Sequence, residues 1–217
     1  MRFIYLHGFC SGPTTFKGNY FRQRFDKLGI ELITPDLNGG DFSHLTLSSQ
    51  IDIAKQTMGS SDEPVTLIGS SMGGYIAALL AQELPLVERT ILIAPAFRFL
   101  NRFIDLIGQD AHRTWRESGW MEIEHFQYGG LHPLHYGIVK DAQKYEQVPL
   151  DREVPTQTFH GLYDDTVPYS TSIDYLRGNA VAELVLFPSD HSLNSEIDAM
   201  WDYMASRIGF SELLELS

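Results

Sequence analysis

A Gly-x-Ser-x-Gly pentapeptide at residues 69–73 stands between two segments of different character. Residues 65–68 are a short, β-branched apolar run typical of a buried strand. Residues 74–81 contain strong helix formers and predict a helix. A strand, a sharp turn and a helix can hold a serine hydroxyl above a sheet, and glycines two positions before and after that serine make room for the turn. Ser71 has both glycines and Ser70 does not, so Ser71 is the candidate nucleophile. The alternative is an ordinary glycine-rich turn before a helix.

Length and composition predict one globular domain over residues 1–217. The chain is 43% hydrophobic and 20% charged, which is ordinary for a protein with a sizeable core. Its net charge of −12 disfavours binding to nucleic acid and to anionic membranes, and solubility is the simplest reason for it. The single cysteine, Cys10, excludes an intrachain disulfide. The apolar residues 3–6 are too short for a secretion signal, and no run reaches membrane-spanning length, so we expect a cytoplasmic protein.

Short apolar runs alternate with longer amphipathic segments along the chain. The alternation predicts an α/β fold with a doubly wound, mainly parallel sheet of about six strands. Ligands of such sheets bind beyond the carboxyl ends of the strands, so functional residues should follow the strands. Strands are predicted at residues 2–6, 32–34, 65–68, 90–94, 156–160 and 184–187, and helices at 20–28, 47–58, 72–83, 169–177 and 193–208.

Residues 97–147 interrupt this alternation and are rich in aromatic residues and histidines. Apolar residues recur there at helical spacing, for example Phe97, Leu100 and Ile104. Because the segment follows a strand at the functional edge of the sheet, we predict an inserted helical cap over the site. The alternative is that these aromatic residues are further core.

A serine hydroxyl is a poor nucleophile and needs a base, which in turn needs an orienting carboxylate. In doubly wound enzymes with this turn, the order along the chain is serine, acid, histidine, each after a strand. His160 ends a predicted strand, whereas His191 follows the next strand and is the histidine that comes after a plausible acid. His191 is therefore the predicted base. The loop between these two strands carries Asp164 and Asp165, and the spacing leaves the choice between them open.

Two backbone N–H groups should meet the negative charge that develops on an attacked carbonyl oxygen. The Met72 N–H directly follows the candidate nucleophile, and the loop after the first strand should supply the second, from Phe9. We expect Gly8 to adopt an unusual backbone angle that permits a close approach, and His7 to support the loop.

Four motifs in this order resemble those of the α/β-hydrolase superfamily. The compact size and residues 1–9 are most similar to the small YqiA/UPF0227-type esterases. The resemblance spans nearly the whole chain except residues 97–147. It implies ester or thioester hydrolysis in the cytoplasm without a cofactor, and it assigns the acid to Asp164, which leaves Asp165 and Asp190 as solvated or helix-capping residues. The motifs are Leu-His-Gly-Phe at 6–9, Gly-x-Ser-Met-Gly-Gly at 69–74, His-Gly-x-x-Asp-x-x-Val-Pro at 160–168 and Asp-His-Ser at 190–192.

Three functions remain open. The first is a serine esterase or thioesterase that acts on a small acyl ester or thioester through an acyl-enzyme on Ser71, with Phe97, Arg98 and Arg102 as candidate substrate contacts. The second follows from a further resemblance, to the menaquinone-pathway enzyme that eliminates pyruvate from a cyclohexadiene carboxylate. Such a substrate would need cations, and the arginines of residues 97–120 could supply them or simply form a solvated helix face. The third is a non-catalytic binding protein on the same scaffold.

No metal site is predicted. His132 and His135 have a spacing that can chelate a metal, but Pro133 argues against a regular helix and no further ligand has a familiar spacing. Surface histidines are the simpler interpretation.

Overall fold

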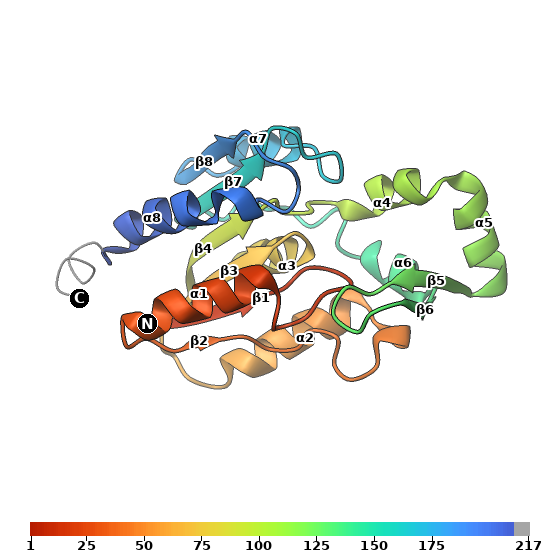
Figure 1. Ribbon diagram of the computed structural model, residues 1–217, viewed down its shortest axis with the longest axis horizontal. Coiled ribbons are helices and arrows are strands. Elements are labelled where there is room, and N and C mark those ends of the chain that lie inside the picture. Colours follow the sequence, from red (N-terminus) through yellow and green to blue (C-terminus); the bar gives the residue numbers. More distant parts are fainter. Residues whose placement is uncertain (211–217) are drawn as a thin grey trace.

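Six parallel strands form the central sheet of the computed structural model, which describes residues 1–210 (Figure 1). Residues 211–217 of the domain expected over 1–217 lie outside the described residues. Every strand predicted from the sequence is present, and the doubly wound parallel sheet is confirmed. In sheet order the strands are β2 (Leu32–Ile33), β1 (Arg2–Leu6), β3 (Val65–Ser70), β4 (Val87–Ile93), β7 (Thr156–Gly161) and β8 (Ala182–Phe187).

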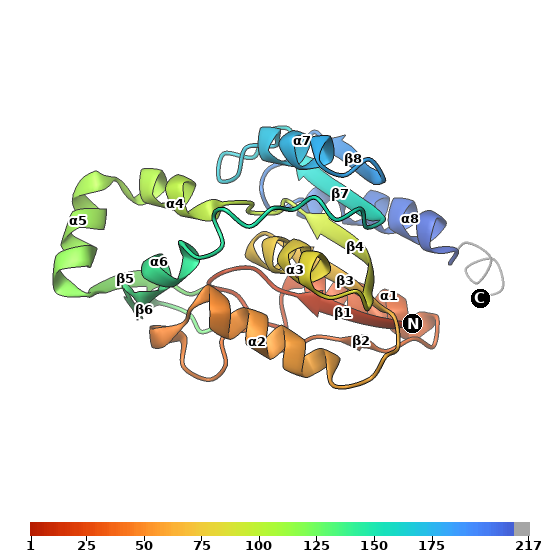
Figure 2. The same ribbon diagram turned by 180° about the vertical axis from the view of Figure 1, so that it is seen from behind.

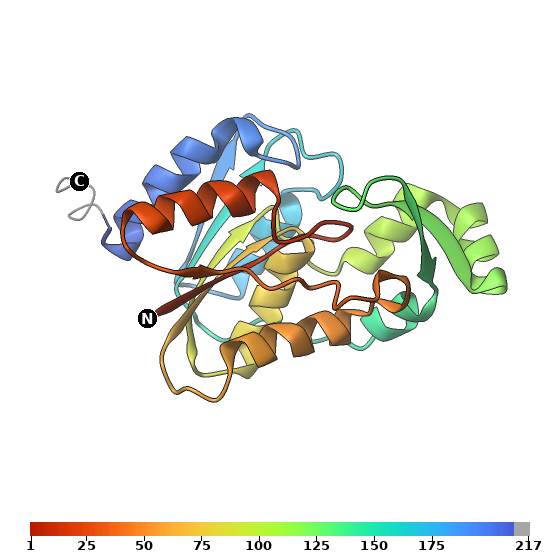
Figure 3. The same cartoon turned by 60° about the horizontal axis from the view of Figure 1, so that its bottom comes forward.

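The strands are covered on both faces, and alternate apolar residues face two separate cores. In β1, Phe3 and Tyr5 face the core under helices α1 (Phe16–Lys27) and α8 (Ile197–Ile208), which lie over the same face of the sheet (Figure 3). Ile4 and Leu6 face the core under α2 (Leu47–Met58) and α3 (Met72–Glu83), on the opposite side with α7 (Ser170–Arg177) (Figure 2). This two-residue period explains why both faces of the sheet are covered by helices.

Two helix starts differ from the sequence prediction for local reasons. Helix α1 begins before residue 20, because the Thr15 hydroxyl caps it by accepting a hydrogen bond from the Gly18 N–H at 3.1 Å. Helix α8 begins at Ile197 rather than 193, because Leu193 has a φ of 52° and a 3₁₀ turn, η2 (Asn194–Glu196), intervenes.

The insertion, residues 97–147, contains helices as expected and also a β hairpin that the sequence analysis did not predict. Figures 1 and 2 show the insertion at one end of the molecule, and its aromatic residues form a third apolar cluster around Trp115. The hairpin follows from the alternating burial along its first strand and from Gly129 and Gly130, whose φ angles of 74° and 76° suit its turn. The elements are α4 (Phe99–Ile107), α5 (Gln109–Ser118), β5 (Trp120–Glu124), β6 (Leu131–His135) and α6 (Gly137–Ala142); a 3₁₀ turn, η1 (Phe42–His44), precedes α2.

Nowhere in residues 1–210 is there a helix with the length and apolar character needed to cross a membrane.

Candidate active site

The turn between β3 and α3 forces Ser71 into a strained conformation. Its φ of 54° and ψ of −116° lie where L-residues are rare. A Cβ on Gly69 would lie 2.3 Å from the Gly73 carbonyl oxygen, and one on Gly73 would lie 2.1 Å from the Leu6 carbonyl oxygen. The Ser71 N–H donates to the Ile93 carbonyl at 2.8 Å and ties the turn to β4. Only glycines fit beside this serine, which explains the pentapeptide.

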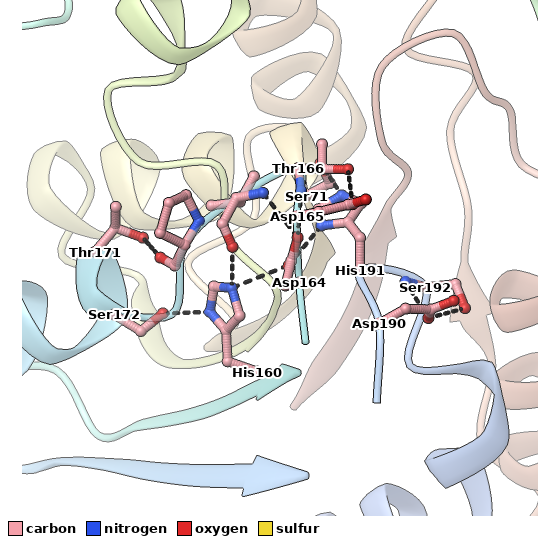
Figure 4. A network of polar contacts seen from close by, with 12 residues as sticks. Ser71, His160, Asp164, Asp165, Thr166, Thr171, Ser172, Asp190, His191 and Ser192 are labelled. Carbon is pink, nitrogen blue, oxygen red and sulfur yellow. Dashed lines mark hydrogen bonds and ion pairs between the residues drawn. The ribbon is translucent and has the colours of Figure 1, made fainter. Parts of the chain in front are cut away.

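Three side chains that are far apart in the sequence meet at the carboxyl ends of the strands (Figure 4). Ser71 Oγ lies 3.1 Å from His191 Nε2, and His191 Nδ1 lies 2.7 Å from Asp164 Oδ2. Asp164 follows β7 and His191 follows β8. Asp165, the other acid considered in this loop, is exposed and takes no part in this chain of contacts. The Asp190 side chain accepts hydrogen bonds from Ser192.

The Asp164 carboxylate is buried and accepts four hydrogen bonds. Its Oδ1 accepts from the N–H groups of Thr166 at 3.0 Å and Val167 at 2.7 Å, while Oδ2 faces both His191 and His160. Burial raises the pKa of this carboxyl, but the hydrogen bonds from His160 and His191 and the attraction of His191 outweigh burial and hold the pKa well below its usual value. Asp164 is therefore ionised and held in a fixed orientation.

His160 also belongs to this network, although its sequence position was not expected to place it there. Its Nε2 lies 3.1 Å from Asp164 Oδ2 and 2.9 Å from the Val167 carbonyl, and its Nδ1 lies 2.8 Å from Ser172 Oγ (Figure 4). Both Nε2 neighbours are acceptors, so Nε2 carries the proton and Nδ1 accepts from the Ser172 hydroxyl. The only available signal was the position of His160, four residues before Asp164 at a strand end.

The loop after β1 lies against the serine. A Cβ on Gly8 would be 3.4 Å from Ser71 Cβ, which is ordinary contact, and Gly8 does not have a positive φ. The unusual angle expected at Gly8 is therefore wrong, because the turn takes its left-handed residue at Cys10, with φ 53°. Among residues 1–210, the backbone N–H groups of Phe9 and Met72 have no hydrogen-bond acceptor, which leaves both free to bind a ligand oxygen.

His7 connects this loop to the segment after β2. Its Nδ1–H donates to the Gly8 carbonyl at 2.9 Å, and its Nε2 accepts from the Leu37 N–H at 2.9 Å. The ring is fully buried, and burial lowers its pKa. A neutral ring with one donor and one acceptor fits both partners.

Two cavities border Ser71, and we call them the small and the large cavity. The small cavity has a volume of about 100 Å³ and its walls are mainly apolar: Phe9, Met72, Phe97, Phe99, Phe103 and Leu106. The large cavity has a volume of about 680 Å³ and includes His191 and exposed aromatic side chains. Its other walls carry hydroxyl, amide and charged groups: Ser11, Thr15, Lys17, Asp165, Asp190 and Asn194.

The three expected substrate contacts have different positions. Phe97 lines the small cavity. Arg102 also borders it, but its guanidinium donates to the carbonyls of Thr166, at 3.0 Å, and Asp165. Arg98 is exposed and lines neither cavity, contrary to expectation. The chain turns at Arg98, with φ 49°, and its charge opposes the burial that raises the pKa of Glu146.

Other candidate groups lie away from the serine or are inert. Burial raises the pKa of the Cys10 thiol to about 12, so it stays protonated. His132 Nε2 lies 3.1 Å from the Gly129 carbonyl. In the part of the chain that the structure describes, no cluster of three His, Cys, Asp or Glu side chains could hold a metal ion.

Comparisons with known proteins agree with this fold. Human palmitoyl-protein thioesterase ABHD10, described as mitochondrial, is 23% identical over an alignment of 208 residues, and the match covers 90% of this chain and 68% of the relative. The structure of mouse ABHD10 superposes with a TM-score of 0.80 at 20% identity and covers 99% of this chain and 90% of the mouse chain. A protein from Agrobacterium vitis S4, described as a candidate hydrolase, superposes with a TM-score of 0.81 at 26% identity, covering 94% of this chain and 86% of that chain.

The fold is thus that of the α/β hydrolases. A family model also matches residues 2–206, which is nearly the whole chain. The chain therefore belongs to the family described as Uncharacterised protein family UPF0227.

Proposed function

We propose that this protein is a serine hydrolase that cleaves carboxylic esters or thioesters through an acyl-enzyme on Ser71. The observation that carries the proposal is the continuous chain of contacts from Ser71 Oγ to His191 at 3.1 Å and from His191 to Asp164 at 2.7 Å. A serine held by a strained turn next to a histidine, with an ionised carboxylate behind it, has the components that activate a hydroxyl at neutral pH.

In the proposed reaction, Ser71 Oγ attacks the acyl carbon while His191 Nε2 takes the hydroxyl proton. Asp164 accepts the His191 Nδ1–H and stabilises the imidazolium that forms. The free N–H groups of Phe9 and Met72 donate to the negatively charged oxygen of the tetrahedral intermediate. His191 then returns the proton to the leaving oxygen or sulfur. Water, deprotonated by His191, attacks the acyl-enzyme and releases a carboxylic acid and free Ser71.

Residues 97–147 would act as the cap in this proposal, because α4 supplies several walls of the small cavity. The thioesterase name of the ABHD10 relatives supports thioesters as one substrate class. Elimination of pyruvate gains no support from the arginines, since Arg98, Arg113 and Arg116 line neither cavity and Arg102 already donates to two carbonyls. The cytoplasmic location remains a prediction.

Labelling with a fluorophosphonate probe tests the assignment. We expect stoichiometric labelling of the wild-type serine and none of Ser71→Ala, while Ser70→Ala, its matched neighbour, is still labelled. Ser71→Ala should also lower esterase kcat/KM by at least about 10³-fold. A folded wild-type protein that is not labelled, or Ser71→Ala that keeps more than about a hundredth of the activity, would overturn the proposal.

A further inference from the structure

Within the proposed function, we infer that the substrate joins a short apolar acyl group, bound in the small cavity, to a larger polar leaving group, bound in the large cavity. Leu106, on α4, is the residue that limits the length of the acyl group. The inference rests on the hydrolytic mechanism proposed above but adds the direction in which the substrate lies and the class of each half.

The direction follows from the place of His191. The base that deprotonates Ser71 must also protonate the leaving atom, so the leaving group has to lie on the same side as the imidazole. His191 lines the large cavity and is not part of the wall of the small one. The acyl chain then extends to the other side of Ser71, where Met72 and Phe9 line the small cavity.

The small cavity limits the size of the acyl group. An apolar cavity of 150 Å³ holds a benzene ring, so a volume of about 100 Å³ holds roughly four carbon atoms. Its walls are aromatic and aliphatic, and Arg102, the one charged side chain among them, donates its hydrogen bonds to the loop after β7. Apolar carbons gain binding energy there and a charged acyl group does not.

One face of α4 forms the outer wall of this cavity. Phe99, Phe103 and Leu106 are three or four residues apart, so their side chains lie on the same side of the helix. The Phe103 ring is held edge-on against Phe9 at 5.7 Å and against Trp115 at 6.1 Å. Leu106 is 50% exposed, so the cavity reaches the surface there. A longer acyl chain would pass Leu106 into water and gain nothing from the additional methylenes.

The large cavity indicates the class of the leaving group. Its volume of about 680 Å³ exceeds that of the small cavity several-fold. Lys17, Asp165 and Asp190 bring charges of both signs to its walls, beside hydroxyl and amide side chains. Phe16, Phe126 and Tyr163 also line this cavity. A leaving group with several hydrogen-bonding groups can pair with the charged and hydroxyl side chains and still pack against these rings, whereas a long alkyl chain leaves the polar walls unpaired.

The test measures kcat/KM on p-nitrophenyl esters from acetyl to palmitoyl, below their micelle concentrations. For the wild-type protein we expect a rise of about fourfold per methylene up to butyryl or hexanoyl and no gain beyond. Because Leu106 is the last apolar wall before solvent, Leu106→Ala should move the optimum to shorter chains and Leu106→Trp, which extends that wall, to longer ones. Asp105→Ala, an exposed neighbour on the same helix that lines neither cavity, should keep the wild-type profile.

A second series fixes the acyl group as butyryl and compares glycerol with hexanol as the leaving alcohol. We expect glycerol butyrate to be preferred by about tenfold, the value of one or two hydrogen bonds. Palmitoyl turnover equal to butyryl turnover, an unchanged profile in both Leu106 variants, or a preference for hexanol would overturn the inference while Ser71-dependent hydrolysis persists. If no ester is hydrolysed in a Ser71-dependent manner, the proposed function fails as well.

Discussion

At the scale of single residues, two histidines share one carboxylate oxygen. Asp164 Oδ2 accepts from His191 at 2.7 Å and from His160 at 3.1 Å. The second donor fixes the rotation of the carboxylate, and it also draws part of the negative charge away from His191. His160 does not approach Ser71, so we assign it a positioning role rather than a catalytic one.

Replacing His160 separates this role from a purely structural one. His160→Leu should lower kcat/KM by about 10- to 100-fold, the range of a hydrogen bond to a charged group. Because the Asp164 charge would then act on His191 alone, the acidic midpoint of the kcat/KM profile should move to higher pH. His160→Gln keeps an N–H at a similar reach and should restore both values. A folded His160→Leu protein with the wild-type profile would contradict the assignment.

The sequence motifs predicted that Ser71, Asp164 and His191 come together, but not every side chain that forms hydrogen bonds around them. The order of Ser71, Asp164 and His191 along the chain brought them to one end of the sheet because every strand of a parallel sheet ends there. The position of His160 at a strand end did not distinguish a core residue from one that binds a carboxylate. Arg102 was expected to contact the substrate, but it donates to loop carbonyls, and no sequence pattern indicates which carbonyls a long side chain will reach.

At the scale of elements, α1 supports the loop that carries His191. Lys17 Nζ, in the first turn of α1, donates to the Ser192 carbonyl at 2.6 Å. Burial lowers the pKa of Lys17 from 10.5 to about 8, and the charge of Asp190 opposes that shift. Helix α1 therefore contacts the loop that carries His191 through Lys17, and burial disfavours the charged form of this lysine.

Because the pKa of Lys17 is lower in the folded protein, its contribution to the free energy of unfolding depends on pH. Between pH 8 and 10.5 the unfolded chain binds more protons at Lys17 than the folded protein, so this group increases the free energy of unfolding as the pH rises. The Lys17→Met variant lacks this pH-dependent contribution. The free energy of unfolding of Lys17→Met minus that of the wild type should therefore be greatest below pH 8 and fall by up to about 3 kcal/mol by pH 10.5. Urea denaturation from pH 7 to 10.5 measures it.

The control is Lys27→Met, an exposed lysine on the same helix, for which the difference should stay constant with pH. A constant difference for Lys17→Met as well would show that Lys17 does not titrate in this range.

The sequence predicted the strands of the sheet better than the hairpin. β1 and β3 are short apolar runs buried on both faces, which is a strong signal. β7 is fully buried although Phe159 is its one large apolar residue, and its place between strands with clearer signals is what indicated it. In contrast, β5 alternates between exposed and half-buried residues, and β6 contains Pro133. The helical spacing of apolar residues correctly indicated α4, but it does not continue through residues 120–135. There the side chains of the hairpin pack against Trp115, and this tertiary packing is not visible in the local sequence pattern.

At the scale of the whole molecule, several polar contacts attach the insertion to the rest of the fold, among them Phe126 N–H to the Cys10 carbonyl and the Tyr75 hydroxyl to the Tyr145 carbonyl, each at 2.9 Å. Two others involve charged side chains. Arg102, on α4, binds the loop after β7. Asp141, on α6, accepts from the Ser48 N–H and from the Ser48 hydroxyl, each at 2.7 Å, in the first turn of α2. Because α4 forms a wall of the small cavity, these contacts connect the stability of the whole fold to the shape of the site.

Replacing Asp141 tests this attachment. Burial raises the pKa of its carboxyl, but hydrogen bonds from Lys144 and Ser48 outweigh burial and lower it below 3.8. The folded state therefore binds fewer protons than the unfolded chain, and the stabilisation is lost as the pH falls below about 5. Asp141→Ala should lower the free energy of unfolding at pH 7 by about 1–2 kcal/mol, because the half-buried Ser48 N–H loses its acceptor and the Ser48 hydroxyl keeps only Tyr145 Oη, at 2.7 Å.

As the pH falls from 6 to 3, the deficit of Asp141→Ala relative to the wild type should shrink, since protonation removes the same interaction from the wild type. Urea denaturation across this range measures it, with the exposed Asp151→Ala as the control that should match the wild type throughout. If Asp141 also holds the insertion over the site, its loss should broaden the acyl-length profile at pH 7. Full stability of Asp141→Ala at pH 7 would show that α6 is held by its apolar packing alone.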